Sequence, residues 1–238
     1  VKGYFGGAAP LPEETLNQLK KLHGAIIYDV YGATENTAFA TVTPWGGKVK
    51  FGTVGVPLPG TDIKIVDLDT GTRELPPKEA GEICIKGPQV MSGYYKKPEE
   101  TAQALKDGWF YTGDIGFFDE DGYLTISDRK KDMICASGFN IYPKEVDEIL
   151  FGHPKILEAC CIGVPDEYRG ETVKAYVVVQ PGETLTEQEV IAYCKGKMTG
   201  YKVPTQVEFI DQLPKSAIGK IMRREVRDMD KKKREGRS

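Results

Sequence analysis

The stretch of residues 114–140 constrains the fold more than any other part of the chain. Two apolar runs, residues 115–118 and 123–126, flank the acidic turn Asp119-Glu-Asp-Gly122. Alternation on both sides of a short, glycine-closed turn predicts a β-hairpin. The six polar residues that follow, 127–132, contain no apolar anchor and are not expected to lie inside a packed element. Such a charged segment predicts either a solvated loop or a linker between two folded bodies.

Size and composition limit the classes of protein to which the chain can belong. Its 238 residues can bury roughly 70% of the surface of the unfolded chain, enough for one large or two modest cores. A net charge of −3 argues against a general nucleic-acid binder, because phosphate contacts require a basic face. No apolar run approaches the ~20 residues of a membrane-spanning helix and no signal peptide is recognisable, so we expect a cytoplasmic protein.

The cysteines do not follow a metal-binding pattern. None forms a Cys-x-x-Cys pair, and the chain has only two histidines, so a soft-metal site is not expected. The adjacent cysteines at 160 and 161 would point to opposite faces of a sheet if they lie on a strand. We expect all five to be reduced core thiols of a cytosolic protein. They are Cys84, Cys135, Cys160, Cys161 and Cys194.

Residues 1–130 are predicted to be the C-terminal part of a large domain of α/β and β-barrel type. Residues 1–60 are typical of an α/β fold, and residues 61–130 of a β-subdomain that could close into a barrel. The predicted elements are strands at 4–5, 25–30, 62–66 and 81–86, and helices at 12–22 and 98–105. The strand at 25–30 is expected to be buried, and small-residue loops follow the first two strands.

Residues 131–238 are predicted to be a small α+β domain joined to the first by a hinge. A helix is expected over residues 143–151, and strands over 159–164, 173–179 and 206–210. The strand at 173–179 is apolar throughout and should be central. Thr186-Glu-Gln-Glu189 is a capping box that opens another helix, whose apolar side carries Val190, Ile191, Cys194 and Met198. The last helix is expected over 220–230, with a frayed basic tail after it.

Tyr31-Gly-Ala-Thr-Glu35 carries groups suited to a nucleotide. A tyrosine ring offers a flat face for a base, and a glycine lets a ligand approach the backbone. Thr34 supplies a hydroxyl for a phosphate, and Glu35 a hard oxygen for Mg²⁺. On these five residues alone, an ordinary turn after a strand is the simpler interpretation.

Asp114 and Lys220 are two further residues whose charged groups suit a nucleotide and its reaction partner. A carboxylate at position 114 can accept both hydroxyl groups of a ribose, although a lone Asp after Gly usually caps a turn. Lys220 follows a Ser-Ala-Ile-Gly loop, and a mobile ammonium there could reach a substrate carboxylate and a phosphate. Most lysines at such positions are surface residues, but a helix start is electrostatically poor for a structural cation.

Several long motifs, in order, resemble the adenylate-forming ligases, the superfamily of acyl-CoA synthetases, luciferases and peptide-synthetase adenylation domains. The motifs are Tyr111-Thr-Gly-Asp114, Asp128-Arg-Lys-Lys-Asp-Met-Ile134, Ser137-Gly-Phe-Asn-Ile-Tyr-Pro-Lys-Glu-Val146 and Leu213-Pro-Lys-Ser-Ala-Ile-Gly-Lys-Ile-Met-Arg-Arg-Glu225. The sequences of these motifs are most similar to those of fatty acyl-CoA ligases, and the resemblance covers nearly the whole chain. It implies ATP, Mg²⁺ and CoA as cofactors or co-substrates and a carboxylic acid, expected to be a fatty acid, as substrate.

The resemblance also implies roles for residues in both domains. Tyr31 and Gly32 would lie at the adenine, Thr34 at the phosphate and Glu35 at the metal. Asp114 would bind the ribose with Arg129 as an added donor. The loop residues Gly7, Ala8 and Ala9 would line the adenine and acyl pocket. In the second domain, Lys131 would be the hinge residue and Lys220 the adenylation lysine. Ser137, Gly138 and Phe139 would line the pantetheine tunnel for CoA.

One departure from the family pattern limits what this chain is expected to do alone. The Ser/Thr/Gly-rich phosphate loop that the family places upstream is absent, and no Gly-x-x-x-x-Gly-Lys-Ser/Thr loop replaces it. The chain also begins at Val1 without methionine, so we expect a fragment that requires an upstream half and is inactive by itself.

Two alternatives remain open. The chain could be a non-catalytic module that binds CoA or a partner, or part of an enzyme that loads a carrier-protein thiol. The basic tail would allow peripheral contact with an anionic membrane, although one short basic run is usually just solvated.

Overall fold

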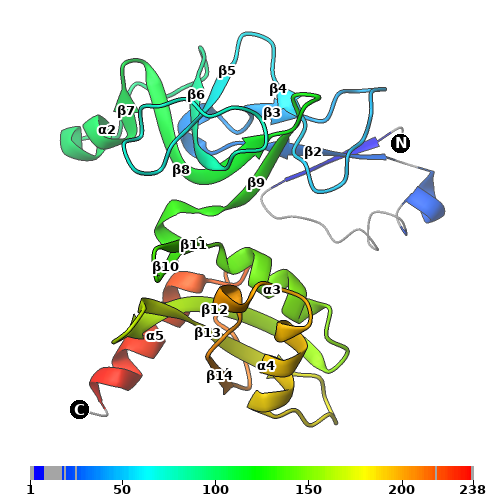
Figure 1. Ribbon diagram of the computed structural model, residues 1–238. Coiled ribbons are helices and arrows are strands. Elements are labelled where there is room, and N and C mark those ends of the chain that lie inside the picture. Colours follow the sequence, from blue (N-terminus) through cyan, green and yellow to red (C-terminus); the bar gives the residue numbers. More distant parts are fainter. Residues whose placement is uncertain (1–2, 8–17, 19, 25, 218, 237–238) are drawn as a thin grey trace. The chain divides into compact units, whose positions relative to one another are not determined.

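The computed structural model describes residues 3–7, 18, 20–24, 26–217 and 219–236 (Figure 1). The chain divides into two compact units, Val1–Lys130 and Lys131–Ser238. Each unit contains its own sheets and its own buried cores. Within the described residues, no helix combines the length and the apolar character needed to cross a membrane.

The first sheet of the first unit has the strand order β1-β2-β3-β4. Its strands are β1 (Gly3–Gly6), β2 (Ile26–Tyr31), β3 (Thr41–Val42) and β4 (Val56–Pro57). The parallel pairing of β1 with β2 is the arrangement expected of an α/β segment. Most of the helix predicted over residues 12–22 lies outside the described residues. The strand predicted at 25–30 forms, but only Tyr28 in it is fully buried, so the prediction of a buried strand was wrong.

The second sheet of this unit is antiparallel throughout. Its strands are β5 (Asp62–Val66), β6 (Gly81–Lys86), β7 (Leu105–Lys106), β8 (Trp109–Phe118) and β9 (Leu124–Arg129), and α2 (Pro98–Ala104) precedes β7. The long strand β8 pairs with β6, β7 and β9. Among the described residues these pairs form an open path, so the predicted closure into a barrel is not found. The core of this sheet is built from Ile65, Ile83, Ile85, Phe110 and Leu124.

The predicted hairpin of residues 115–126 is confirmed as part of β8 and β9. Asp119 Oδ1 accepts hydrogen bonds from the backbone N–H groups of Asp121 and Tyr123, and Gly122 has a φ of +78°. The prediction that residues 127–132 lie outside packed elements was wrong, because β9 continues to Arg129 and the 3₁₀ turn η2 (Lys130–Asp132) follows directly. Two of these polar side chains form ion pairs in the first unit, Arg129 with Asp114 of β8 and Lys130 with Glu82 of β6.

The second unit is built on one five-stranded sheet with the order β11-β10-β13-β12 and β14 beside β13. Its strands are β10 (Ile134–Ala136), β11 (Phe139–Ile141), β12 (Ile156–Asp166), β13 (Gly170–Val179) and β14 (Gln206–Phe209). Its helices are α3 (Pro143–Phe151), α4 (Glu187–Lys195) and α5 (Arg223–Glu235), with the 3₁₀ turn η3 (Gly200–Lys202) after α4. The predictions of a helix over 143–151, a central strand at 173–179 and a capping box at Thr186 are confirmed.

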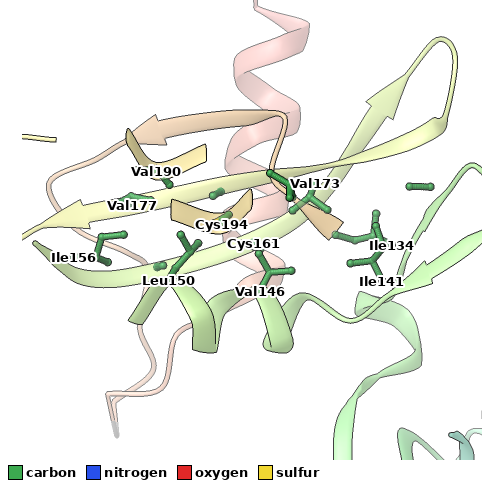
Figure 2. Packing of buried hydrophobic residues seen from close by; sticks show 14 residues of the cluster. Ile134, Ile141, Val146, Leu150, Ile156, Cys161, Val173, Val177, Val190 and Cys194 are labelled. Atoms are coloured by element: carbon green, nitrogen blue, oxygen red, sulfur yellow. The ribbon is translucent and has the colours of Figure 1, made fainter. Parts of the chain in front are cut away.

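Both faces of this sheet are covered, each by a separate apolar cluster. Because side chains alternate along a strand, Cys161 belongs to the cluster beneath α3 and α4 while Cys160 belongs to the cluster beneath α5. Figure 2 shows the first cluster, with Val146 and Val190 of the two helices directed toward the sheet. The second cluster includes Val226 of α5. The opposite orientations predicted for the two adjacent cysteines are thereby confirmed.

The cysteines are free thiols, and four of the five are buried. Burial raises the pKa of Cys84 and of Cys160 to about 12, so neither is a thiolate near neutral pH. Cys135 is exposed, and the prediction of five core thiols was wrong at this position. It lies on the short strand β10, whose side chains alternate between the core and the solvent.

The last helix begins and ends later than predicted. It runs from Arg223 to Glu235, so part of the tail predicted as frayed is helical. Arg234 donates to Asp230 one turn earlier, and Lys233 forms an ion pair with Glu208 of β14. These contacts fix the basic residues that the sequence pattern assigns to solvent.

Candidate functional site

Asp114 lies at the centre of a small polar cluster in the first unit. The residue is 8% exposed, and each carboxylate oxygen accepts one hydrogen bond. The Tyr31 hydroxyl donates to Oδ2 at 2.8 Å, and Arg129 Nε donates to Oδ1 at 3.0 Å. Three residues from separate motifs, Tyr31, Asp114 and Arg129, therefore meet, and we call them the Asp114 cluster. Since a carboxylate has about four lone-pair positions, this one can still accept hydroxyl groups of a ligand.

The local structure around Asp114 holds its carboxylate in place. Asp114 and Arg129 are direct partners in the β8–β9 ladder, which puts their side chains on one face. Thr112 Oγ1 accepts from the Asp114 N–H at 3.0 Å and donates to the Ile83 carbonyl at 2.8 Å. Gly113 between them has a φ of +70°, a conformation that glycine adopts without strain. The Thr-Gly-Asp segment is thus a structured bend within a long strand.

Tyr31 ends β2 as a half-buried, neutral donor. Burial, together with the negative charge of Asp114, raises its pKa well above the usual value for a phenol. The hydroxyl therefore keeps its proton and stays bonded to the carboxylate across the physiological pH range. The ring itself belongs to the end of a strand, so the Tyr-Gly-Ala-Thr-Glu motif begins within the sheet and not after it.

The chain turns sharply after Tyr31. A Cβ atom at Gly32 would lie 2.0 Å from the carbonyl oxygen of Ala38, so only glycine fits here. Thr34, Glu35 and Asn36 form the 3₁₀ turn η1 (Thr34–Asn36), in which the fully buried Asn36 side chain accepts a hydrogen bond from the backbone N–H of Ala33. This turn leaves Thr34 exposed and Glu35 half-buried.

Glu35 is held from two directions. Its Oε1 accepts a hydrogen bond from the Tyr94 hydroxyl at 2.9 Å, and its carbonyl accepts from the backbone N–H of Met91 at 2.7 Å. Within the described residues, no group of three or more His, Cys, Asp or Glu side chains could hold a metal ion by itself. A single carboxylate still fits Mg²⁺, because that ion commonly takes one or two protein carboxylates with phosphate oxygens and water as its other ligands.

Of the predicted first loop, only Gly7 lies within the described residues. A Cβ atom at Gly7 would lie 2.8 Å from Cγ2 of Val30, so this glycine lets the loop pass close to β2. Ala8 and Ala9 lie outside the described residues.

The predicted Ser-Gly-Phe segment of the second unit is the turn of a tight hairpin. Ser137 and Gly138 have φ values of +52° and +80°, and Ala136 pairs with Phe139 on either side of them. Two positive φ values in a two-residue loop are the pattern of a type I′ turn. A Cβ atom at Gly138 would meet nothing within 4 Å, so the space beside it is open. Phe139 is 53% exposed and stacks on Tyr201 with ring centroids 4.6 Å apart.

The segment predicted to be a hinge is tied to α5 within the second unit. The carbonyl of Lys131 accepts a hydrogen bond from Arg227 Nη1 at 2.7 Å. Asp132 forms ion pairs with Arg227 at 2.7 Å and with Arg223 at 3.7 Å. Arg223 also contacts the buried Asp147 of α3 and donates to the Cys161 carbonyl at 3.0 Å. The Lys131 side chain itself is exposed.

Lys220 is exposed, and its backbone carbonyl accepts a hydrogen bond from within the loop. The Ser216 N–H donates to the Lys220 carbonyl at 2.8 Å, and the Met222 N–H donates to the Pro214 carbonyl at 2.9 Å. Helix α5 begins only at Arg223, so the prediction that Lys220 lies at a helix start was wrong. The argument from helix electrostatics therefore does not apply to it.

Tyr94 and Asn36 are site residues that sequence reasoning did not identify. Both act on the Thr34–Glu35 turn, one through the Glu35 carboxylate and one through the Ala33 backbone. Asn36 directly follows the motif and could have been noticed as an amide among turn residues. Tyr94 lies 59 positions from Glu35, and no local pattern connects the two.

Comparison with known proteins gave consistent results for both units. The family model of the AMP-binding enzyme matches residues 1–95, and that of the AMP-binding enzyme C-terminal domain matches residues 145–220. The long-chain-fatty-acid–CoA ligase of Escherichia coli O6:H1 is 45% identical over 223 residues, which are 94% of this chain and 39% of that protein.

Two solved structures show the same mixed α/β fold. ATP-bound MatB from Rhodopseudomonas palustris matches with a TM-score of 0.88 and 37% identity, over 94% of this chain and 44% of that one. O-succinylbenzoate coenzyme A synthetase from Bacillus subtilis, in complex with ATP and magnesium ion, matches with a TM-score of 0.83 and 32% identity over 95% and 46%. The chain thus spans less than half the length of these relatives.

Proposed function

Because this chain belongs to the AMP-binding enzyme family, we propose that it is part of an ATP-dependent acid–thiol ligase that joins a fatty acid to CoA. The Asp114 cluster carries the proposal. A buried carboxylate that is held by Tyr31 and Arg129 is a pre-oriented acceptor for the two hydroxyl groups of a ribose. Glu35, held by Tyr94, supplies the carboxylate that a phosphate-bound cation requires.

The nucleotide is the ligand for which the first unit is suited. We assign the adenine to the faces of Tyr31 and Gly32 with the loop of Gly7, Ala8 and Ala9, and the ribose to Asp114 with Arg129. Thr34, exposed on its turn, is assigned to the phosphate. Mg²⁺ bound at Glu35 would neutralise part of the phosphate charge.

The reaction we assign has two steps. In the first, a carboxylate oxygen of the acid attacks the α-phosphorus of ATP, the bond to the bridging oxygen breaks, and pyrophosphate leaves. The ammonium of Lys220 offsets the repulsion between the two anions as they approach. In the second step, the CoA sulfur attacks the acyl carbon, AMP leaves, and the thiol proton passes to solvent.

Separate residues of the second unit serve the separate steps in this proposal. Lys220 acts in adenylation, and the exposed Ser137-Gly138-Phe139 turn, with open space beside Gly138, lines the path of the pantetheine arm. Rotation at Lys131 between the steps would let one nucleotide site serve both transition states. The fatty-acid substrate is proposed because the similar protein of Escherichia coli O6:H1 is a long-chain-fatty-acid–CoA ligase.

The two half-reactions of the full-length protein test the assignment of Lys220. Lys220→Ala should reduce ATP–pyrophosphate exchange by about 100-fold or more, because one charged donor to the transition state is lost. Thioester formation from supplied acyl-AMP should change by less than about 3-fold. Lys231→Ala, which removes an exposed lysine of α5, is the matched control and should leave both rates unchanged. Equal losses in both half-reactions would remove Lys220 from this role.

The 238-residue chain by itself should show negligible exchange. It contains no Ser/Thr/Gly-rich phosphate loop, so the β- and γ-phosphates would lack the contacts that such a loop provides. Robust exchange by this chain alone would refute the proposed dependence on an upstream half.

A further inference from the structure

We infer that Tyr94 is a positioning residue for the divalent cation, because its hydroxyl holds one oxygen of Glu35 and leaves the other for the metal. The inference rests on the proposed function, in which Glu35 binds Mg²⁺. The contact at 2.9 Å between its hydroxyl and Glu35 Oε1 is the primary observation.

A short segment, residues 89–94, runs beside the η1 turn and is bonded to it three times. The Thr37 hydroxyl donates to the Gln89 carbonyl at 2.9 Å, and the Met91 N–H donates to the Glu35 carbonyl at 2.7 Å. The hydroxyl of Tyr94 completes the set at the Glu35 carboxylate. Backbone and side chain of Glu35 are therefore both fixed by the same segment.

Tyr94 is itself anchored on the side away from Glu35. Its backbone N–H donates to Thr101 Oγ1 of α2 at 2.9 Å, and Thr101 in turn donates to the Lys97 carbonyl at 2.7 Å. At Gly93, with a φ of +150°, an added Cβ would lie 2.7 Å from Cγ2 of Thr101. The segment is thus packed closely against α2, and the backbone of Tyr94 is held in place.

The two carboxylate oxygens of Glu35 differ in their hydrogen bonding. Oε1 accepts the Tyr94 hydroxyl, whereas no protein hydrogen bond to Oε2 occurs in the part of the chain that the structure describes. A half-buried glutamate would otherwise distribute over several rotamers, and ordering it would cost free energy each time a cation binds. Partners of a metal-binding carboxylate typically contribute 10–100-fold to metal affinity.

The phenol is suited to remain a donor. A neutral hydroxyl orients the carboxylate without adding a positive charge that would repel the cation.

Tyr94→Phe in the full-length protein is the decisive variant, with Tyr95→Phe as its matched control. Tyr95 is the next residue and is 86% exposed. Mn²⁺ binding in the presence of a non-hydrolysable ATP analogue is measured by electron paramagnetic resonance. The Mg²⁺ concentration that half-saturates ATP–pyrophosphate exchange is measured alongside. Tyr94→Phe should weaken Mn²⁺ binding by about 10-fold or more and raise the half-saturating Mg²⁺ equally. The rate at saturating Mg²⁺ should change by less than about 2-fold, and Tyr95→Phe should match the wild type.

The possible outcomes separate this inference from the proposed function. Wild-type protein that binds no Mn²⁺ with nucleotide overturns both. Wild-type binding with an unchanged Tyr94→Phe affinity overturns the inference alone, as does a loss of maximal rate without a shift in metal dependence. A second measurement needs no variant: anomalous scattering from Mn²⁺ bound with the analogue should lie at Glu35 Oε2. A metal at Oε1, with the Tyr94 hydroxyl displaced, overturns the inference.

Discussion

At the scale of single residues, Asp114 and Asp121 differ in burial and in the groups that contact their carboxylates. Asp114 follows a glycine, where an aspartate usually caps a turn, yet it lies inside β8 and accepts from both Tyr31 and Arg129. Asp121, in the turn between β8 and β9, is the ordinary case, because its carboxylate is exposed and forms ion pairs with Lys48 and Lys50. Substitution of Asp114 therefore tests the ribose assignment, and the same substitution at Asp121 is its control.

Asp114→Asn in the full-length protein should weaken AMP binding by about 10–100-fold, because hydrogen bonds to a charged acceptor contribute about 1.5–3 kcal/mol. Isothermal titration calorimetry measures the dissociation constant. Asp121→Asn should leave it within about 2-fold of the wild-type value. An Asp114→Asn variant that binds AMP as tightly as the wild type would contradict the ribose assignment.

At the scale of elements, helix α5 is attached to the sheet of the second unit by a buried carboxylate. Asp230 is fully buried. It accepts hydrogen bonds from Lys174 and Tyr176 of β13 at 2.7 Å each, and from Arg234 of its own helix at 2.7 Å. Burial alone would raise the pKa of Asp230, but these three donors lower it overall. The charged form is therefore the one that stabilises the docked helix.

Removing this charge should destabilise the second unit. Asp230→Asn is expected to cost about 1.5–3 kcal/mol in the free energy of unfolding, since hydrogen bonds to a charged acceptor are lost while Lys174 keeps its ion pair with Glu208. Urea denaturation followed by circular dichroism measures the difference. Asp228→Asn, at an exposed position of the same helix, should change stability by less than about 0.5 kcal/mol.

The contribution of Asp230 to the free energy of unfolding should decrease as the pH falls. Because its pKa is lower in the folded chain than the unfolded value near 3.9, its contribution is present above about pH 4 and is lost as the pH falls further. The difference in stability between the wild type and Asp230→Asn should therefore shrink below about pH 4. A difference that stays constant down to pH 2 would show that folding does not lower the pKa of Asp230.

At the scale of the whole molecule, the two units have separate sheets and separate cores. The strands of the second unit pair only with one another among the described residues, and both of its apolar clusters are built from residues after 131. Residues 131–238 expressed alone should therefore unfold cooperatively in urea, with coincident transitions by fluorescence and circular dichroism. A gradual loss of signal without a transition would show that this unit needs the rest of the chain.

Local patterns predicted many of the elements correctly, and each success has a short-range cause. The hairpin of β8 and β9 follows from alternation around a glycine turn, and the start of α4 follows from Thr186 and Glu189. The failures lie where a distant partner changes the outcome. β9 continues to Arg129 because β8 pairs with residues 128 and 129, and the basic end of α5 is ordered by Glu208 and Asp230.

The sequence by itself determined the family, the identity of the strands and helices with strong periodicity, and the residues whose chemistry suits a nucleotide. Only the tertiary structure showed that Tyr31 and Arg129 bond to opposite oxygens of Asp114, and that Tyr94 holds Glu35. The physical reason is the separation along the chain over which each kind of interaction acts. Periodicity and turn chemistry act within a few residues, whereas a hydrogen bond joins any two groups that the fold brings together, and 83 positions separate Tyr31 from Asp114.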